Sequence, residues 1–477
     1  MSKLENLLND PIFETISKHA DKINQPAYVI GGYVRDKLLN PNNNPKDIDI
    51  VVIGDSLNFA QSLCEDMGLD SSSLNVFKNY GTVMLNFKDL QIEFVSARKE
   101  SYKSDSRKPL VELGTFKDDQ NRRDFTINAL ALGLNKVNYG DLIDPFNGLN
   151  DLKNRIIRTP LDPEITFSDD PLRMLRAIRF SCQLNFSISD STLDAIRNVN
   201  DRIKIISKER ICQELNKIIK SNYPSKGFVL LHIVGLLEFI MPELAALDII
   251  DTYNGKSHKN NFYHSLAVLD NVAIKSDDLW LRWAALLHDI AKPLCKQYNE
   301  KTGWTFHGHE VKGAKMVPKI FKNLKLPLND KMKFVQKMVL LHMRPIALTQ
   351  AEVTDSAIRR LLLEADRDID KLMLLCSADI TTANPNKQKL YTENFALVHQ
   401  KLQEVESRDQ IKNWKSPLNG NEIMNLLQID HGKQIGALKT SLKEAILEGY
   451  ITNEKEAAIE FILKEALALG ITTKKTG

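Results

Sequence analysis

Short apolar runs separated by polar residues occupy the first 150 positions of the chain. Runs of alternating or β-branched character predict strands. They occur at residues 27–30, 47–54, 83–87 and 92–95. Residues 99–119 are charged and show no period, so we expect a mobile loop there. This part of the chain therefore predicts a small domain built on a mixed sheet.

From about residue 150 onward, apolar positions recur at spacings of three and four, the period of a helix that buries one face. The pattern is clearest at residues 172–180, 211–219, 281–290, 338–342, 361–375 and 457–469. The most apolar segment, residues 228–241, contains Glu238 and is too short to span a bilayer. We expect it to be a buried helix, with no membrane segment. The fold class is therefore α+β, a sheet domain followed by a long all-helical region.

Clusters of Pro, Gly, Asn and Ser divide the chain into four expected parts. The boundaries give a sheet domain and three helical parts, at residues 1–150, 151–225, 226–410 and 411–477. The 64 basic and 61 acidic residues leave a formal charge of +3, which excludes a histone-like polycation and a charged disordered chain. A local basic face for nucleic acid remains compatible with that balance.

The five cysteines show no tight spacing, which argues against a disulfide framework and against a cysteine-based zinc site. A reducing cytosol suits such a chain. The N-terminal residues carry acidic side chains and no apolar core, so we expect no secretory signal and a cytoplasmic location.

The strongest local signal is a pair of glycines followed by an acidic dyad. Gly31 and Gly32 lie between a predicted strand and a helix, where they let the backbone approach a bulky anion. The helix that follows presents free N–H groups to phosphate, and Arg35 adds a bidentate contact one turn later. Asp47 and Asp49 are two apart on a strand, so both carboxylates point to one face.

Two carboxylates on one face repel each other unless a cation lies between them. Hard oxygen ligands beside substrate phosphates suit Mg²⁺. Glu93, on a later predicted strand, completes a set of three carboxylates for two metal ions, which would activate an attacking hydroxyl and stabilise a leaving pyrophosphate. The alternative is a tight glycine turn followed by a solvated strand edge.

These motifs resemble the nucleotidyltransferase superfamily that includes DNA polymerase beta. The resemblance is greatest to the class II tRNA nucleotidyltransferases, or CCA-adding enzymes, and to bacterial poly(A) polymerases. Its second motif is present as Arg122-Arg123-Asp124 followed by Asn128-Ala129. The resemblance implies a polymerase-beta-like sheet domain in which Arg123 contacts the nucleotide and the motif containing Asp124 selects ribose. An exposed charged turn is the alternative.

The next motif, Asp169-Asp170-Pro171-Leu172-Arg173, places Asp170 and Arg173 three apart on one helical face. A carboxylate accepts and a guanidinium donates, which matches the amine and ring nitrogen of cytosine or adenine. Uracil and guanine present the opposite polarity. The pair resembles the family's protein template, although Asp169 stands where the family has Glu. The resemblance adds nucleotide contacts from Arg176 and Arg179. The alternative is that Asp170 only caps the helix, with Pro171 at its first position.

Six of the ten histidines lie between His258 and His342. Four of them and two aspartates resemble the ligand set of the HD phosphohydrolase superfamily: His264, His288, Asp289, His309, His342 and Asp379. Imidazole and carboxylate ligands together suit a divalent transition metal better than Mg²⁺ alone. His307 is the closest competitor to His309. The alternative is a set of satisfied core histidines.

The resemblance extends to residues 417–457, which are similar to the tail with which CCA-adding enzymes bind tRNA. The strongly basic C-terminal arm typical of the related poly(A) polymerases is missing. The sequence therefore indicates addition of CCA to tRNA from CTP and ATP, with residues 151–225 reading the base. It leaves open A-only or CC-only addition, a poly(A) polymerase, and a metal phosphohydrolase with a nucleotide-sensing N-terminal half. The oligomeric state is also left open.

Overall fold

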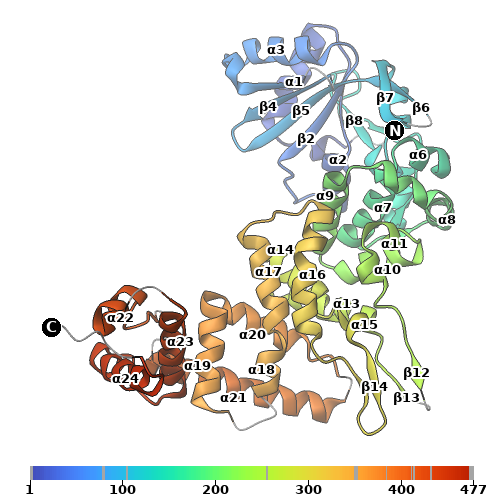
Figure 1. Ribbon diagram of the computed structural model, residues 1–477. Coiled ribbons are helices and arrows are strands. Elements are labelled where there is room, and N and C mark those ends of the chain that lie inside the picture. The colour runs from blue at the N-terminus through green and yellow to red at the C-terminus, as the bar shows by residue number, and fades with distance from the viewer. Residues whose placement is uncertain are drawn as a thin grey trace. The chain divides into compact units, whose positions relative to one another are not determined.

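The computed structural model describes residues 4–77, 81–103, 106–253, 256–348, 353–382, 384–409, 411, 414–429 and 432–471. The chain folds into two compact units (Figure 1). Unit 1 comprises Met1–Ala245 with Lys322–Leu326, and unit 2 comprises Ala246–Phe321 with Pro327–Gly477. The expected α+β class is confirmed, because the sheet lies in the first part of unit 1 and helices make up most of the rest. The division into four parts stays a prediction.

Seven strands form the main sheet of unit 1. In spatial order they are β3 (Leu74–Phe77), β4 (Thr82–Phe87), β5 (Leu90–Ser96), β2 (Asp47–Val52), β1 (Ala27–Ile30), β8 (Ala131–Gly133) and β9 (Leu142–Ile143). Strands β2 and β5 are parallel, and the other neighbours are antiparallel. The four predicted strands are confirmed, although β2 ends two residues before the expected boundary. The parallel register places Asp49 opposite Glu93.

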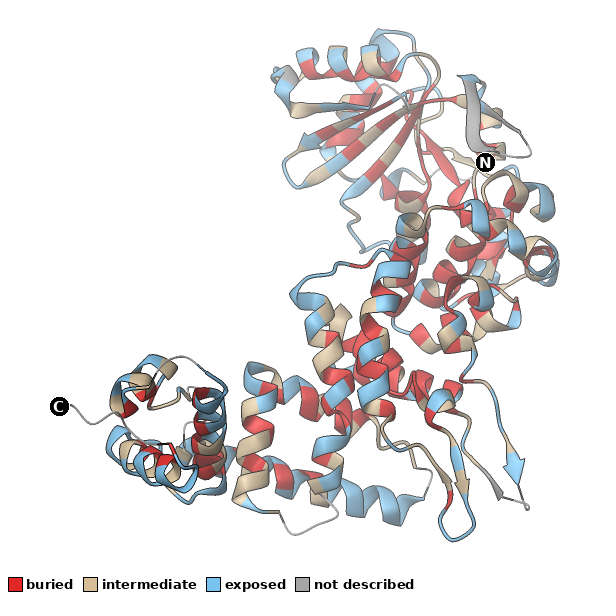
Figure 2. Ribbon diagram, viewed as in Figure 1, coloured by how far each residue is buried: buried red, intermediate tan, exposed pale blue. Residues whose placement is uncertain are grey.

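Three helices pack against this sheet: α1 (Pro11–Lys22), α2 (Gly32–Leu39) and α3 (Ser56–Asp66). Asp10 accepts the N–H of Ile12 at the start of α1, and Asp55 caps α3 in the same way. The core between them is aromatic, since Phe59 and Phe94 are fully buried with ring centroids 5.5 Å apart. Figure 2 shows the sheet as the most buried part of this region.

The loop expected at residues 99–119 is wrong for the described residues. Strands β6 (Arg98–Lys103) and β7 (Ser106–Leu113) form an antiparallel hairpin, and α4 (Phe116–Asn121) follows it. Thr115 and Asp118 form a reciprocal capping box at the start of α4. Backbone pairing satisfies a hairpin without an apolar alternation, so its charged sequence carried no strand signal. Residues 104 and 105 lie outside the described residues.

The remainder of unit 1 is helical. Its helices are α5 (Gly148–Asn154), α6 (Pro163–Asp169), α7 (Leu172–Leu184), α8 (Asp190–Val199), α9 (Lys208–Ile219), α10 (Pro224–Ile233), α11 (Leu237–Ile240) and α12 (Pro242–Ala245), with a small parallel pair β10 (Ile156–Ile157) and β11 (Ser187–Ile188). The helices predicted at 172–180 and 211–219 are confirmed. The single helix expected at 228–241 is wrong, because the chain breaks at Gly235 with φ +73°. A Cβ there would lie 2.7 Å from the Asn200 side-chain nitrogen.

Unit 2 has two small hairpins and twelve described helices, of which α16 runs on into the Lys322–Leu326 segment of unit 1. The strands are β12 (Thr252–Tyr253), β13 (Lys256–Ser257), β14 (Gln297–Asn299) and β15 (Gly303–Thr305). The helices are α13 (Asn261–Lys275), α14 (Leu279–Leu287), α15 (Lys292–Cys295), α16 (His309–Leu324), α17 (Asp330–Leu341), α18 (Met343–Leu348), α19 (Asp355–Ala365), α20 (Ile369–Ala378), α21 (Pro385–Asp409), α22 (Gly420–Leu427), α23 (Lys433–Glu448) and α24 (Lys455–Ala468).

Three helix predictions for unit 2 differ in their ends from the structure. The helix expected at 281–290 ends at Leu287, so His288 and Asp289 directly follow α14. The segment 338–342 is the end of α17. The single helix expected at 361–375 is wrong, because Asp366 adopts φ +52° and separates α19 from α20. The helix expected at 457–469 is confirmed as α24.

The core of unit 2 is centred on α14, where Trp283 is fully buried and packs near Phe321. The last three helices bury a separate apolar cluster of their own, which includes Leu438, Leu442 and Ile462. Among the residues that the structure describes, no helix combines the length and apolar character needed to cross a membrane.

Candidate active site and metal centre

A cavity of about 620 Å³ opens in unit 1 beside the carboxyl-bearing strands β2 and β5. Ten of the twelve residues predicted for this site line it, and only Asp170 and Arg173 do not. The ten are Gly31, Gly32, Arg35, Asp47, Asp49, Glu93, Arg123, Asp124, Arg176 and Arg179. Asn128, Phe180 and Lys217 also line the cavity and had not been predicted to.

The three carboxylates meet at one wall of the cavity. Burial raises the pKa of Asp49, and the neighbouring charge of Asp47 raises it further, while Arg123 acts in the opposite direction. Burial and the charge of Asp49 likewise raise the pKa of Glu93. Such crowding disfavours three negative charges unless a cation is present. Among the described residues, however, these three oxygen donors are not all drawn to within 4.8 Å of one another.

The glycine at the end of β1 is required by close approach. Gly31 has φ +83°, and a Cβ there would lie 3.2 Å from both Arg123 Nη1 and Asp49 Oδ2. The absent side chain therefore lets a guanidinium and a carboxylate from separate elements come close to the start of α2. A nucleotide phosphate in the cavity would meet the backbone, Arg123 and the acidic wall together.

A chain of hydrogen bonds links the motifs. Arg35 Nη1 donates to Asn128 Oδ1 at 2.7 Å, and Asn128 Nδ2 donates to Asp124 Oδ1 at 3.0 Å. Arg176 Nη2 lies 2.5 Å from Asp124 Oδ2. Burial by itself would raise the pKa of Asp124, but the charge of Arg176 and the hydrogen bonds from Asn128 and Arg176 outweigh it and lower the pKa to about 2.

Phe180 collects three cationic side chains on the floor of the same cavity. The guanidinium carbons of Arg35, Arg176 and Arg179 lie 5.1, 5.6 and 4.1 Å from its ring centroid. Glu214 holds Arg179 from the other side, with Nε and Oε2 2.6 Å apart. The ring and the carboxylate thus fix the arginines in place before any ligand binds.

Asp170 and Arg173 lie outside the cavity, and each has another partner. Asp170 Oδ1 accepts the N–H of Leu172 at 3.2 Å, which is the cap interaction, and its Oδ2 lies 3.3 Å from Arg210 Nη2. Arg173 Nη2 donates to the carbonyl of Arg122. Pro171 directly precedes the first residue of α7, as expected. The base-reading role of the pair stays a prediction.

In unit 2 the structure brings together all six residues of the predicted metal site. They form two groups whose donor atoms lie within 4.8 Å of one another, His264 with His288 and Asp379, and Asp289 with His309 and His342. His307 is exposed, which favours His309 as the ligand. The six come from α13, α16 and the ends of α14, α17 and α20, so the fold closes a site from distant segments.

Backbone carbonyls orient three of these histidines. The Nδ1 atoms of His288, His309 and His342 lie 2.7 to 2.8 Å from the carbonyls of residues 285, 306 and 339. A carbonyl requires a donor, so each ring carries its proton on Nδ1 and directs the Nε2 lone pair inward. His288 Nε2 is buried and makes no hydrogen bond in the described structure. This donor set fits a pair of divalent metal ions.

The charges at this centre are strongly coupled. Burial disfavours the charged form of His288, but Asp289 and Asp379 outweigh it and raise the pKa of His288 to about 10. Burial and the charge of His288 lower the pKa of His342 to about 4. Lys292 Nζ lies 2.5 Å from Asp289 Oδ2 and adds positive charge to the same carboxylate. Without metal ions, protons and lysine thus balance the acidic ligands.

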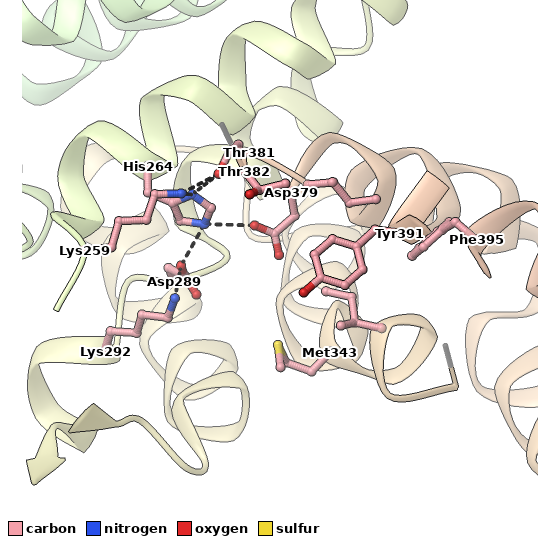
Figure 3. Close-up of a pocket in the computed structure, with 12 residues that line it drawn as sticks. Lys259, His264, Asp289, Lys292, Met343, Asp379, Thr381, Thr382, Tyr391 and Phe395 are labelled. Carbon is pink, nitrogen blue, oxygen red and sulfur yellow. Dashed lines mark hydrogen bonds and ion pairs between the residues drawn. The ribbon is translucent and has the colours of Figure 1, made fainter. Parts of the chain in front are cut away.

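A second cavity of about 670 Å³ adjoins this centre (Figure 3). Its lining includes three of the six ligands together with Lys259, Tyr391 and Phe395, which sequence reasoning missed. Lys259 precedes α13 and the two aromatic residues lie on α21, more than a hundred positions away along the chain. No spacing along the sequence marks such a grouping.

Three family models match the chain. The poly A polymerase head domain matches residues 27–158, the probable RNA and SrmB-binding site of polymerase A matches residues 185–247, and the HD domain matches residues 261–384. The first covers the sheet and the first cavity's glycines and carboxylates. The third covers the six residues of the metal centre.

Two curated relatives and one solved structure are similar over long stretches. An A-adding tRNA nucleotidyltransferase of Deinococcus radiodurans is 32% identical over 352 residues, which is 72% of this chain and 78% of the relative. A CCA-adding enzyme of Anoxybacillus flavithermus is 34% identical over 279 residues, 58% of this chain and 63% of the relative. The crystal structure of a tRNA nucleotidyltransferase with a primer tRNA and an incoming ATP analog aligns with a TM-score of 0.57 and 25% identity, covering 82% of this chain and 99% of that one.

Proposed function

Because this chain belongs to the family of tRNA nucleotidyltransferases and poly(A) polymerases, we propose that it adds CCA to the 3′ end of tRNA from CTP and ATP. The observation that carries the proposal is the cavity in which Asp47, Asp49 and Glu93 face an array of arginines. An acidic wall beside a cationic floor suits a triphosphate whose α-phosphate is attacked.

In the proposed reaction the 3′ hydroxyl of tRNA attacks the α-phosphate of the incoming nucleotide, and pyrophosphate leaves. Asp47 and Asp49 would hold Mg²⁺, with Glu93 as the third carboxylate. Bound Mg²⁺ supplies positive charge to the attacking and leaving oxygens. Arg35 and Arg123 bind the triphosphate, the backbone at Gly31 lets it approach, and Arg176 and Arg179 complete the nucleotide contacts.

Base choice in this proposal rests on Asp170 and Arg173, and ribose choice on Asp124. Cytosine and adenine both offer an amine to the Asp170 carboxylate and a ring acceptor to the Arg173 guanidinium, whereas uracil and guanine do not. Substrate choice rests on the shape of tRNA, which residues of the C-terminal helices contact. Each nucleotide would displace the present partners of the pair, Arg210 and the carbonyl of Arg122.

A-only and CC-only addition are the competing forms of this activity, and the A-adding relative from Deinococcus keeps the first one open. The test uses three purified tRNAs that end at the discriminator base, after one C and after CC. Each is incubated with CTP alone, ATP alone or both. Complete CCA synthesis on the shortest tRNA supports the proposal, while addition only to the tRNA ending in CC shows an A-adding enzyme.

We also propose a metal-dependent phosphohydrolase activity at the six-residue centre of unit 2. The two groups of donors carry this second function, because a divalent transition metal held there would activate water toward a phosphoester. Phosphate release from phosphoesters should require added metal and should be lost in His288→Ala. Nucleotide addition should survive that change. Its loss would favour a phosphohydrolase whose N-terminal half senses nucleotides.

A further inference from the structure

The cavity beside the metal centre has two chemically different sides (Figure 3). One side is charged and carries His264, Asp289 and Asp379 together with Lys259 and Lys292. The other side is apolar and is lined by Met343, Ile346, Tyr391 and Phe395. A site that needed only to bind inorganic phosphate or a short sugar phosphate would gain nothing from the second side.

The aromatic residues of the apolar side are arranged as one surface. Tyr391 and Phe395 are four positions apart on α21, so they lie on the same face of the helix. Tyr391 is 38% exposed and Phe395 is 8% exposed, which leaves one ring open to a ligand and the other packed behind it. Figure 3 shows the Tyr391 ring across the cavity from His264 and Asp379, with its hydroxyl directed into the cavity.

The charged side has a cation placed for an anionic group. Lys259 Nζ lies 3.1 Å from His264 Nδ1 and also contacts the hydroxyl of Thr381. Its ammonium therefore stands at the rim of the metal centre, opposite the aromatic surface. A phosphate between Lys259 and the ligands would leave the rest of the molecule pointing toward Tyr391.

We propose that Tyr391 and Phe395 make this centre selective for phosphomonoesters whose leaving group carries a flat ring, with Lys259 holding the phosphate. The inference rests on the phosphohydrolase activity proposed above and adds its substrate class. In the step, water adds to phosphorus and the bond from phosphorus to the ester oxygen breaks. That oxygen takes a proton from the water, giving the ring-bearing alcohol and inorganic phosphate.

The test compares AMP with ribose 5-phosphate, which share the phosphoester and the sugar and differ only in the base. With saturating Mn²⁺ or Ni²⁺, the full chain should release phosphate from AMP with a kcat/KM about tenfold higher, since stacking on one aromatic ring contributes that much. Tyr391→Leu should bring the ratio of the two values toward one. Phe395→Leu keeps apolar volume and should reduce the ratio less. Leu397→Ala, an exposed position on the same helix, should keep the ratio of the wild type.

Equilibrium dialysis of labelled AMP gives a readout that does not depend on turnover. AMP bound in the nucleotidyl-transfer cavity is common to wild type and Tyr391→Leu, so the difference between them isolates this cavity. A binding component lost in Tyr391→Leu and weakened in Lys259→Met supports the inference. If neither phosphoester is hydrolysed, the phosphohydrolase proposal fails, and the dialysis alone decides on the aromatic surface. Equal hydrolysis of AMP and ribose 5-phosphate, or identical AMP binding by wild type and Tyr391→Leu, overturns the inference.

Discussion

Replacing Asp124 by Asn removes one negative charge from the centre of the polar network and keeps the size of the side chain. Asp124 is 8% exposed and accepts hydrogen bonds from the Phe125 N–H, Asn128 and Arg176. An amide retains part of these bonds but loses the attraction to the guanidinium. The stability difference between the two proteins therefore measures the charge on this carboxyl.

The size of that difference follows from the pKa. The pKa of Asp124 falls from 3.8 to about 2 in the folded protein, which corresponds to about 2 kcal/mol at neutral pH. Because the folded pKa lies below the unfolded one, the stabilisation is present above pH 4 and is lost as the pH falls toward 2. Asp124→Asn should thus unfold about 2 kcal/mol more easily at pH 7, and by about 1 kcal/mol less than that at pH 3.

Urea unfolding of the full chain provides the assay. The four tryptophans, at positions 280, 283, 304 and 414, all lie in unit 2, so their fluorescence follows that unit. The change in far-UV circular dichroism that fluorescence does not follow reports unit 1, which contains Asp124. Asp201→Asn, an exposed position in the same unit, is the matched control and should change stability by less than about 0.5 kcal/mol. A destabilisation by Asp124→Asn that is equally large at pH 7 and pH 3 would refute the electrostatic reasoning.

Three further changes test other parts of the account. Asn128→Ala removes the amide between Arg35 and Asp124, and kcat/KM for nucleotide addition should fall by about tenfold or more; an unchanged value would show that the network does not position these groups. Phe180→Leu removes the ring beneath three guanidinium groups, and the urea midpoint of unit 1 should fall by an amount equal to about 1–2 kcal/mol, with no shift counting against the cation–π contribution. Adding Ni²⁺ to metal-free protein should raise the Tm seen by tryptophan fluorescence, and His342→Ala should remove most of that rise; an equal rise in the variant would place the metal elsewhere.

Much of the first cavity could be predicted because its motifs are local. The glycine pair follows β1 directly, and Asp47 and Asp49 share a face by strand geometry alone. The position of Glu93 opposite Asp49 depends on the register of β2 and β5, which pair over more than forty residues. That register follows from the whole sheet, so the sequence supported only an expectation.

Predictions failed where tertiary partners outweigh local pattern. The hairpin β6–β7 is held by backbone pairing and carries charged side chains, so no alternation marked it. Asp170 and Arg173 share a helical face as expected, yet Arg210 and the carbonyl of Arg122 occupy them. At the metal centre the ligands were found by resemblance, whereas Lys259 and Tyr391 meet only through the packing of α13 and α21 and had no signal of their own.

The central claim is that the carboxylates of β2 direct nucleotide transfer to the end of a tRNA. The most direct measurement sequences the products formed by the full chain on a tRNA that ends at its discriminator base, with CTP and ATP and Mg²⁺. The wild type should add C, C and A in that order, and Asp47→Asn should add nothing while its circular dichroism stays native. No added nucleotide with the wild type, or the same products with Asp47→Asn, would contradict the claim.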